Sequence, residues 1–357
     1  MTGFLSGSAI RRFVIALIIG WIGGAIFAWL NLPLPWMLGA MAATMGASLA
    51  GVDIAVPQGV RKPTITVVGV ILGSAFTSDR IENVIDWLPS VAIMPVYVLV
   101  LGAAILFYLR RISGFDHKTG FFAASPGGLS EMVIVADQLG GDLRNVALFH
   151  SARLILIVFS IPLLASYAVN LDSTIPIDAR HNEIRPFDLA GVAAIGAVGW
   201  ALAGPLRLPA PTFMGPLIVS MTVHLTGLIS LDPPVFLLAT AQLIIGSSVG
   251  SRFSGVPLGL IIRTLFIGSG GALIMFALTV LFAIVLQQMT GFPLTLLLLA
   301  LIPGGFPEMS LIALSMGMDP AFVVTHHALR TLIIFTFAIP IFRLLSRNGW
   351  FKRFWYS

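Results

Sequence analysis

Two short motifs in this chain join helix-breaking residues to a carboxylate inside otherwise apolar sequence. Residues 125–132 read Ser-Pro-Gly-Gly-Leu-Ser-Glu-Met, and residues 302–309 read Ile-Pro-Gly-Gly-Phe-Pro-Glu-Met, 177 positions later. Proline removes a backbone donor and clashes with the preceding turn, while glycine widens backbone freedom, so each motif predicts an unwound stretch. Unwound backbone at membrane depth is tolerated where protein or a wet cavity satisfies its polar groups, and we therefore expect a cavity at the motifs.

Each motif is followed by residues that can begin a new helix, over 129–139 and over 306–316. The first amides of such a helix have no intrahelical partner, and its positive dipole end attracts anions. We therefore predict a substrate site of amides and hydroxyls made by Ser125, Gly127, Gly128, Ser130, Gly304 and Gly305. Because the two serines become Ile302 and Pro307 in the second motif, the site should hold its ligand asymmetrically. The alternative is that Pro-Gly-Gly only kinks a packed helix.

A carboxylate lies about one turn into each new helix, at Glu131 and Glu308. An ionised carboxylate at the centre of a membrane helix costs roughly 2.5–3.5 kcal/mol on insertion scales unless it is protonated or paired. A coupling proton, a sodium ion or an arginine of the next helix could compensate it. We predict that Glu131 and Glu308 carry the coupling ion. The alternative is a pair of internal salt bridges that hold the bundle together.

A His-x-x-Arg pair follows each motif, with His150 and Arg153 after the first and His327 and Arg330 after the second. Residues three apart share a helix face, and the arginine fork suits a carboxylate, either of a glutamate or of a bound organic acid. We predict that the arginines bind substrate and that the histidines support them. Adjacent His326 and His327 diverge around a helix, and the sequence has no clustered ligands of the kind a copper or iron oxygenase needs, so we expect no metal and no cofactor.

The composition places the chain in a lipid bilayer. Apolar residues make up 57% of the 357 residues, charged residues only 10%, and the mean hydropathy is +1.00. Long runs that are apolar on every face indicate helices rather than barrel strands, which would alternate over about ten residues. The net charge of +5 could suggest nucleic acid, but the basic residues lie in short loops and at the ends, as orientation signals do. Because cysteine is absent, disulfides are excluded.

The chain is predicted to be duplicated over nearly its whole length. Leu-Pro-x-Pro followed by glycine occurs at 32–39 and 208–215, and Asp142 matches Asp319. Gly73-Ser74 is matched with Gly246-Ser247 at an offset of 173. The predicted organisation is a first repeat over 1–169, a polar linker over 170–187 and a second repeat over 188–357.

Each half contains six apolar elements, and the fifth carries the Pro-Gly-Gly motif. The first half has them near 13–30, 36–50, 63–77, 87–109, 120–139 and 145–168. The second half has them near 188–206, 212–229, 235–251, 260–288, 293–316 and 320–345. If all six span, the halves run parallel, whereas a fifth element that dips in and returns gives five crossings and inverted halves.

Loop charge favours the inverted order, because Lys and Arg concentrate on cytoplasmic loops. Inverted halves leave Arg80, Arg180 and Arg185 outside, while parallel halves leave four arginines outside, among them Arg144 and Arg252. The fold class is therefore predicted to be an all-α polytopic membrane protein with inverted repeats and both termini in the cytoplasm.

The duplicated Pro-Gly-Gly-x-x-Glu-Met element, the His-x-x-Arg pairs and the two-copy layout resemble the AbrB family of bacterial inner-membrane proteins. That family also carries the label of an ammonia monooxygenase, and its name derives from a role in regulating gene expression. The resemblance implies a multi-pass protein of the inner membrane. By architecture alone, the pattern is also similar to anion transporters with re-entrant glycine hairpins in inverted halves.

Three functions remain open at this stage. The first is a secondary transporter of a small anion, an organic acid, coupled to protons or sodium, rather than an enzyme. The second is a membrane sensor that alters gene expression through a partner, since the sequence has no helix-turn-helix appendage of its own. The third and remote function is a membrane oxygenase. The expected partners are the anionic solute, the bilayer and further copies of this chain, with no nucleic acid.

Overall fold

In a computed structural model, the chain is described over residues 7–77, 84–169 and 184–351, with side chains omitted at 129–131 and 165–169. Within these ranges the protein contains fourteen α-helices and short π and 3-10 turns, without a strand. Seven of the described helices are long and apolar enough to cross a membrane. The predicted class, an all-α multi-pass membrane protein, is confirmed. Arg80, Arg180 and most of the predicted linker lie outside the described residues.

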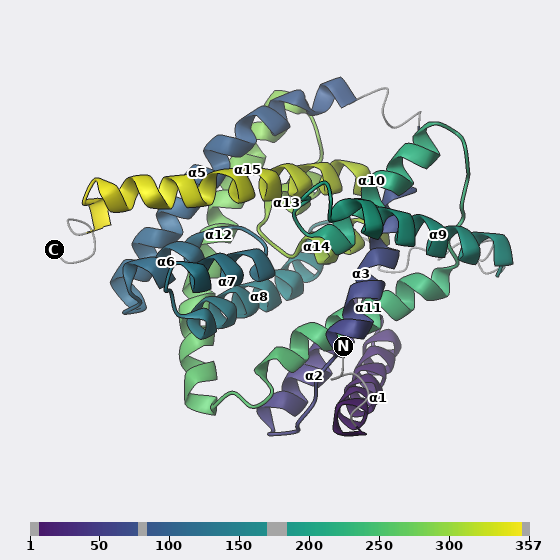
Figure 1. Cartoon of the computed structure of the whole chain (residues 1–357), viewed down its shortest axis with the longest axis horizontal. Coiled ribbons are helices and arrows are strands. Elements are labelled where there is room, and N and C mark those ends of the chain that lie inside the picture. Colours follow the sequence, from purple (N-terminus) through teal and green to yellow (C-terminus); the bar gives the residue numbers. More distant parts are fainter. Residues whose placement is uncertain (1–6, 78–83, 170–183, 352–357) are drawn as a thin grey trace. The chain divides into compact units, whose positions relative to one another are not determined.

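The described helices match the twelve predicted elements closely (Figure 1). Those of the first half are α1 (Gly7–Trp29), η2 (Pro35–Gly39), α2 (Ala40–Leu49), α3 (Gln58–Gly73), η3 (Val84–Trp87), α5 (Leu88–Ile112), α6 (His117–Ala124), α7 (Leu129–Gln138) and α8 (Leu143–Val169). Those of the second half are α9 (Pro186–Ala203), α10 (Pro211–Leu225), α11 (Val235–Gly250), η5 (Ser251–Phe253), α12 (Leu258–Thr290), α13 (Leu294–Leu301), α14 (Phe306–Ser315) and α15 (Pro320–Arg347).

The chain forms two compact units, and each draws segments from both predicted repeats. Unit 1 comprises Met1–Asn83, Val158–Leu258 and Pro307–Ala321. Unit 2 comprises Val84–Ile157, Gly259–Phe306 and Phe322–Ser357. Both Pro-Gly-Gly motifs and both His-x-x-Arg pairs therefore belong to unit 2, whereas Glu308 belongs to unit 1.

In unit 1, an unusual backbone geometry recurs at a fixed interval. Among described non-glycine residues, a positive φ occurs at Asn31, Leu34, Arg207 and Ala210, which form two pairs at an offset of 176. Leu34 and Ala210 each precede a proline that begins the next helix. Left-handed backbone is disfavoured for residues with a Cβ, so the surrounding packing must hold both turns.

Close helix packing in unit 1 recurs in the same way. A Cβ on Gly23 would overlap the carbonyl oxygen of Gly39, and a Cβ on Gly215 would overlap that of Gly199. These helices approach closely because small residues lie at the crossing, as is common between membrane helices. The two sets of contacts recur at an offset of 176, and the duplication of the chain stays a prediction.

The same contacts correct one predicted match. Gly246 packs on the carbonyl of Met37, and Gly69 packs on the carbonyl of Phe213. Gly246 is therefore the structural counterpart of Gly69, at an offset of 177, and the match of Gly73-Ser74 with Gly246-Ser247 is wrong by one helical turn. A shift of four residues keeps the same helix face, so sequence similarity alone could not separate the two alignments.

In unit 2, α5 and α12 run antiparallel. The hydroxyl of Tyr97 lies 2.8 Å from that of Thr279, and the hydroxyl of Tyr108 donates to the carbonyl of Ile267 at 3.0 Å. Beyond these, Arg263 donates to the carbonyl of Ser113 at 2.7 Å. The sequence predicts that α5 and α12 are corresponding elements of two halves, and inverted repeats would require these opposite directions; the repeats themselves stay a prediction.

The fifth element of the first half enters and returns on the same side. The amide of Asp142, just before α8, donates at 2.9 Å to the hydroxyl of Thr119, near the start of α6. Both ends of the α6–α7 hairpin are therefore adjacent, as Figure 1 shows beside α8. In the second half, the rings of Phe292 before α13 and Phe322 at the start of α15 are 5.1 Å apart. The predicted re-entrant form is thereby observed.

Glycine packing in unit 1 gives a first testable prediction. The Gly246→Ala variant should lower the free energy of unfolding by about 1–3 kcal/mol, because the new methyl group would overlap the Met37 carbonyl and force the helices apart. Thermal unfolding of the detergent-solubilised protein measures the change. Gly46→Ala is the matched control, since a Cβ there meets nothing within 4 Å. Equal unfolding temperatures for the two variants would contradict the packing account.

Candidate functional site

The first break lies between α6 and α7. The helix α6 ends at Ala124, and Ser125 turns out of it with φ −62° and ψ 125°. Gly128, which is also extended, precedes α7 and offers no side chain to cap the amides of the new helix. Pro126 explains the end of α6, because the residue before a proline avoids helical backbone.

The second break repeats this geometry. The helix α13 ends at Leu301, and Ile302 leaves it with φ −58° and ψ 135°. The amide of Gly304 then donates to the carbonyl of Ile302 at 2.8 Å, and α14 begins at Phe306. In both motifs the glycines are half-buried. The predicted unwinding at Pro-Gly-Gly is confirmed in both places.

Arg330 binds the carbonyls that the second break leaves without helical partners. Its Nη1 donates to the carbonyls of Leu301 at 3.0 Å and Ile302 at 2.8 Å, and its Nη2 donates to that of Gly304 at 3.3 Å. The side chain is 3% exposed. Since the last carbonyls of a helix carry its negative dipole end, they stabilise the buried guanidinium.

Arg153 makes the corresponding contacts at the first break, but they are longer. Its Nη1 lies 3.5 Å from the carbonyl of Ser125, and its Nη2 lies 3.4 Å from that of Gly127. Both distances exceed the usual 2.7–3.2 Å of a good N–H···O bond. Its Nε has no hydrogen-bond partner among the described residues, although the side chain is only 4% exposed. Arg153 therefore retains donor capacity that Arg330 has used.

The two histidines of the pairs brace the helices that end at the breaks. His150 Nε2 lies 3.0 Å from the carbonyl of Phe122, and His327 Nε2 lies 2.9 Å from that of Leu299. A carbonyl only accepts, so the proton resides on Nε2 of both rings. Nδ1 of His327 then accepts from Arg330 at 2.9 Å, which fixes a neutral ring. The role of supporting a substrate site, which the sequence predicted for His150 and His327, stays a prediction.

His326 does not share the environment of His327. Its Nδ1 lies 2.8 Å from the carbonyl of Phe322, and its Nε2 lies 2.9 Å from the hydroxyl of Ser90 on α5. The neighbouring histidines therefore contact different elements, as predicted from their spacing. The described residues contain no group of three or more His, Cys, Asp or Glu side chains that could hold a metal ion.

Both arginines belong to unit 2 and lie within electrostatic range of each other. Arg153 and Arg330 are close enough for their like charges to repel, and the hydroxyl of Tyr97 lies within electrostatic range of both. Tyr97 is fully buried and bonds to Thr279, whose own hydroxyl donates to the carbonyl of Met275 at 2.6 Å. The hydroxyl of Tyr97 therefore donates to that of Thr279, and the Tyr97 oxygen can still accept a hydrogen bond. Sequence reasoning missed Tyr97, for which an isolated polar ring in an apolar span was the available signal.

Neither arginine forms an ion pair with a carboxylate among the described side chains. The ion pair that is found there joins Arg12 to Asp53, at 2.7 Å. Glu308, which is 4% exposed, belongs to unit 1 and interacts electrostatically with Arg252 of that unit. Arg252 is half-buried, although the sequence suggested a loop position for it. The side chains of Ser130 and Glu131 lie outside the described residues.

The hydroxyl of Ser125 has an internal partner. It donates at 3.0 Å to the carbonyl of Phe121, one turn earlier in α6. The sequence predicted that this hydroxyl donates to a ligand. The side chain would have to rotate before it could do so. Backbone amides and Arg153 are the donors at the first break that remain available without rearrangement.

The hairpin begins with a charged cap outside the long spans. The carboxylate of Asp116 accepts from the amides of Lys118 at 2.8 Å and Thr119 at 3.2 Å, and from the hydroxyl of Thr119. Partial burial tends to raise the pKa of this carboxyl, but the Thr119 hydroxyl and the two amides outweigh it and lower the pKa below its ordinary value. The cap is thus ionised at neutral pH.

Comparison with known proteins places the chain in a family. A family model described as "Transition state regulatory protein AbrB" matches residues 36–346, a range that includes both breaks and both arginines. The chain belongs to the AbrB family. The family resemblance predicted from the two motifs is confirmed.

Two AbrB-family relatives match over nearly their whole length. "Uncharacterized protein YhjN" of Bacillus subtilis strain 168 is 26% identical over 348 residues, with 90% of each chain covered. "Putative regulator AbrB" of Escherichia coli strain K12 is 26% identical over 326 residues, with 90% of this chain and 92% of the relative covered.

The unequal contacts of the two arginines predict unequal effects on stability. Arg330→Ala should destabilise the protein by about 3–5 kcal/mol, because three carbonyls at the second break lose a buried charged donor. Arg153→Ala should cost clearly less, since its contacts are long. Thermal unfolding in detergent compares the two variants. Equal losses, or a larger loss for Arg153→Ala, would contradict this assignment.

The Asp116 cap predicts a dependence on pH. Asp116→Ala should lower the unfolding free energy by about 1 kcal/mol at pH 7. Because the folded pKa is depressed, the carboxylate contributes fully above its unfolded pKa of about 3.9, and the contribution is lost as pH falls through the folded value. Unfolding scans from pH 7 downward should show the gap between wild type and variant closing. In Asp116→Asn the acceptor remains, so a smaller loss independent of pH is expected.

Proposed function

We propose that the protein is a secondary active transporter of a small anion, an organic acid, coupled to protons or sodium. The two Pro-Gly-Gly breaks and the arginines that bind them form its substrate site. In this proposal the protein resides in the bacterial inner membrane with both termini in the cytoplasm, and no covalent chemistry takes place.

The observation that carries the proposal is the pair of buried guanidinium groups in unit 2. Two like charges repel in a medium of low dielectric constant, and neither arginine has an ion-pair partner among the described side chains. Helix C-terminal carbonyls offset part of this charge. An anion that binds between the breaks would offset the rest and would gain charge-assisted hydrogen bonds.

Arg153 is the residue best suited to contact the solute. Its Nε is buried without a partner in the described residues, and its terminal contacts are long enough to be exchanged for a ligand. A carboxylate matches the guanidinium fork in two parallel bonds, which favours organic acids over spherical anions such as chloride. The uncapped amides at the start of α7 face the same break and would add further donors.

Coupling is assigned to Glu131 and Glu308, which lie about one turn beyond the breaks. A carboxylate buried in the membrane changes its protonation or binds sodium when the local charge changes. An anion that binds at the arginines would alter the local charge around these carboxylates. Solute and cation would then bind together, as symport requires.

Uptake in proteoliposomes tests the proposal. Protein reconstituted with a panel of labelled mono- and dicarboxylates should accumulate at least one of them under an imposed proton or sodium gradient. Arg153→Gln should reduce that uptake by roughly tenfold or more, because a charged hydrogen bond to a buried ligand contributes about 1.5–3 kcal/mol. Arg343→Gln, in which an exposed arginine of α15 is replaced, is the matched control and should retain uptake.

A second comparison addresses coupling. Glu131→Gln with Glu308→Gln should permit exchange of solute across the membrane but abolish accumulation against a gradient. Concentrative uptake that is undiminished in this double variant would remove the coupling role of the carboxylates. Full uptake by Arg153→Gln would remove the substrate site itself.

Regulation of gene expression through a partner is the second candidate function, and the word "regulator" in the name of the Escherichia coli relative favours a regulatory role. In this alternative the same site senses an anion and signals through a partner protein. A deletion strain complemented with Arg153→Gln separates the two. Restoration of normal transcript levels by a variant that no longer transports would favour sensing without transport.

A further inference from the structure

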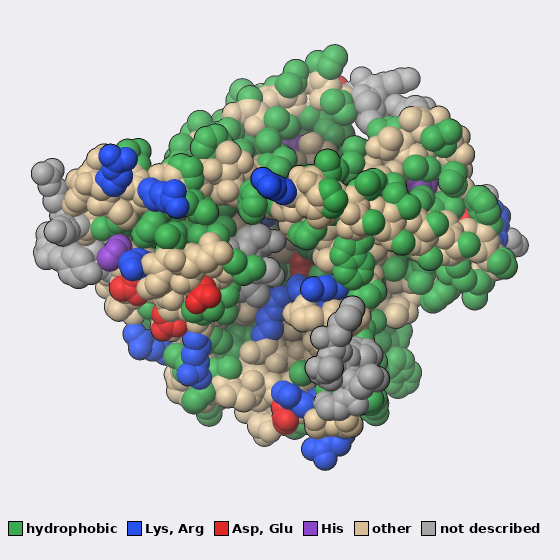
Figure 2. Space-filling view, in the orientation of Figure 1, with side chains coloured by type: hydrophobic (Ala, Val, Ile, Leu, Met, Phe, Trp, Pro, Cys, Tyr) green, Lys and Arg blue, Asp and Glu red, His purple; other side chains and the backbone are tan. Residues whose placement is uncertain are grey.

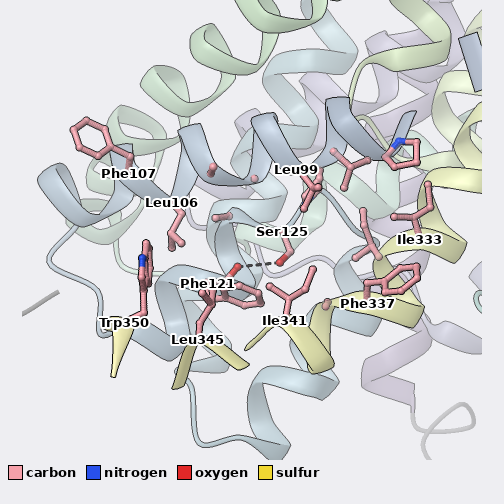
Figure 3. Close-up of a pocket in the computed structure, with 18 residues that line it drawn as sticks. Leu99, Leu106, Phe107, Phe121, Ser125, Ile333, Phe337, Ile341, Leu345 and Trp350 are labelled. Atoms are coloured by element: carbon pink, nitrogen blue, oxygen red, sulfur yellow. Dashed lines mark hydrogen bonds between the residues drawn. The ribbon is translucent and has the colours of Figure 1, made fainter. Parts of the chain in front are cut away.

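An apolar groove of about 650 Å³ lies within unit 2, beside the first break (Figure 3). Its walls come from α5, α6 and α15, and include Leu99, Leu106, Phe121, Phe337 and Ile341. Ser125 and Pro126 of the first motif also line it. The groove therefore brings an apolar surface directly against the unwound backbone whose carbonyls Arg153 binds.

Several of the side chains that line this groove are exposed, and they belong to helices long enough to cross the bilayer. Leu99 is 59% exposed, Phe107 is 51% exposed and Phe337 is 53% exposed. On membrane-spanning helices α5 and α15, such side chains face the acyl chains of the lipid. The groove is thus open to bilayer lipid rather than to water.

The dimensions of the groove match one leaflet of a membrane. Along α5 it extends from Pro95 to Phe107, a separation of twelve residue steps, which corresponds to roughly 18 Å at 1.5 Å per residue. A leaflet is about half of the 30 Å hydrocarbon thickness. A single acyl chain that starts at the Phe107 end would reach past Ser125 and Pro126 near the middle of the membrane.

Charge is concentrated at one end of the groove. Arg110 and Arg111 follow Leu106 and Phe107 by four residues and so continue the same stripe of α5 by one turn. The guanidinium of Arg111 lies over the Phe107 ring, 5.4 Å from its centre. Trp350, whose amphipathic ring is typical of the lipid headgroup level, lines the same end.

Further basic side chains surround this end of unit 2. Figure 2 shows Lys and Arg side chains over the C-terminal end of α15, and Arg263 binds the carbonyl of Ser113 just after α5. At the opposite end, Pro95 and Ile333 line the groove and bring no charge. An occupant that complements this pattern has one anionic end and a long apolar tail.

We propose that this groove binds an anionic phospholipid of the cytoplasmic leaflet, with its phosphate at Arg110 and Arg111 and an acyl chain against Ser125 and Pro126. The lipid contacts the outer side of the break, where it can hold the α6–α7 hairpin in place. Its headgroup would lie on the side to which positively charged loops orient the protein.

Lipid binding can be measured with defined probes. Purified, delipidated full-length protein should be stabilised against heat by phosphatidylglycerol and much less by phosphatidylcholine, and native mass spectrometry should detect bound phosphatidylglycerol. Each arginine near an anionic headgroup contributes about 1 kcal/mol, so Arg111→Gln should weaken this binding about fivefold and the Arg110→Gln, Arg111→Gln double variant further. Arg343→Gln is the control, because its position lies about 200° around α15 from Ile341.

A second variant tests the path of the acyl chain. Gly102 lines the groove, and a Cβ there meets nothing within 4 Å, so Gly102→Leu fills the groove without disturbing a neighbour. It should reduce bound phosphatidylglycerol while the protein stays monodisperse. Gly259→Leu, another position with open space, is the control and should bind like wild type.

Three results would overturn the proposal. They are equal stabilisation by the two lipids in wild type, unchanged phosphatidylglycerol binding in the arginine double variant, and unchanged binding in Gly102→Leu. Loss of binding in Arg343→Gln as large as in Arg111→Gln would also reject this groove as the site. Solute uptake is not needed for any of these measurements, so they stand apart from the transport proposal.

Discussion

The structure depends on guanidinium groups that bind carbonyls at helix ends buried in the membrane. A helix that stops within the hydrocarbon leaves its last carbonyls without hydrogen-bond donors, and each unsatisfied group costs several kcal/mol. Arg330 serves three carbonyls at the end of α13, and Arg153 reaches two at the end of α6. Without such donors, Pro-Gly-Gly would be intolerable at these positions. The arginine and the break are therefore one structural device.

The arginines that bind the breaks place two positive charges in the interior of unit 2, a cost that continuous helices would avoid. A buried charge is expensive, and two of the same sign raise the expense. Neutral groups relieve only part of it. His327 stays uncharged because its Nε2 donates to a carbonyl while its Nδ1 accepts from Arg330, and Tyr97 provides an oxygen within range of both arginines. The positive potential that remains is the property on which the proposed binding of an anionic solute rests.

Much of the local structure could be predicted because hard steric rules govern it. Proline and paired glycines end a helix wherever they occur, so the limits of α6, α7, α13 and α14 followed from the motifs. The partner of each arginine did not follow. Spacing of three residues showed that histidine and arginine share a face, but the expected partner was a carboxylate, either of a glutamate or of a bound organic acid, and the observed partners are backbone carbonyls. Which carbonyl a side chain reaches depends on tertiary distances that sequence spacing does not encode.

Other parts of the site escaped sequence reasoning for the same reason. Tyr97 bonds to Thr279 across 182 positions, and Glu308 interacts with Arg252 across 56 positions, in both cases between elements that share no motif. The Gly246 alignment failed by one turn because glycine and serine recur on one helix face at intervals of a turn. Pattern reasoning is reliable where one residue type forces a conformation. It fails where two distant residues must meet.

Arg153 and Arg330 hold equivalent positions in the sequence but differ in how many of their donors form short hydrogen bonds. This difference suggests a structural role for Arg330 and a ligand-binding role for Arg153. Arg330 makes contacts of 2.8, 3.0 and 3.3 Å with carbonyls and another of 2.9 Å with His327. Arg153 makes contacts of 3.5 and 3.4 Å, and its Nε has no partner among the described residues. A guanidinium group whose donors are all used can stabilise a helix end but has few donors left for a ligand. A guanidinium group with unused donors can stabilise a helix end and also bind a ligand. The asymmetry expected from the serines of the first motif therefore resides in the arginines. In the transport proposal, the first break is therefore the place where the solute binds, and the second break is the structural support.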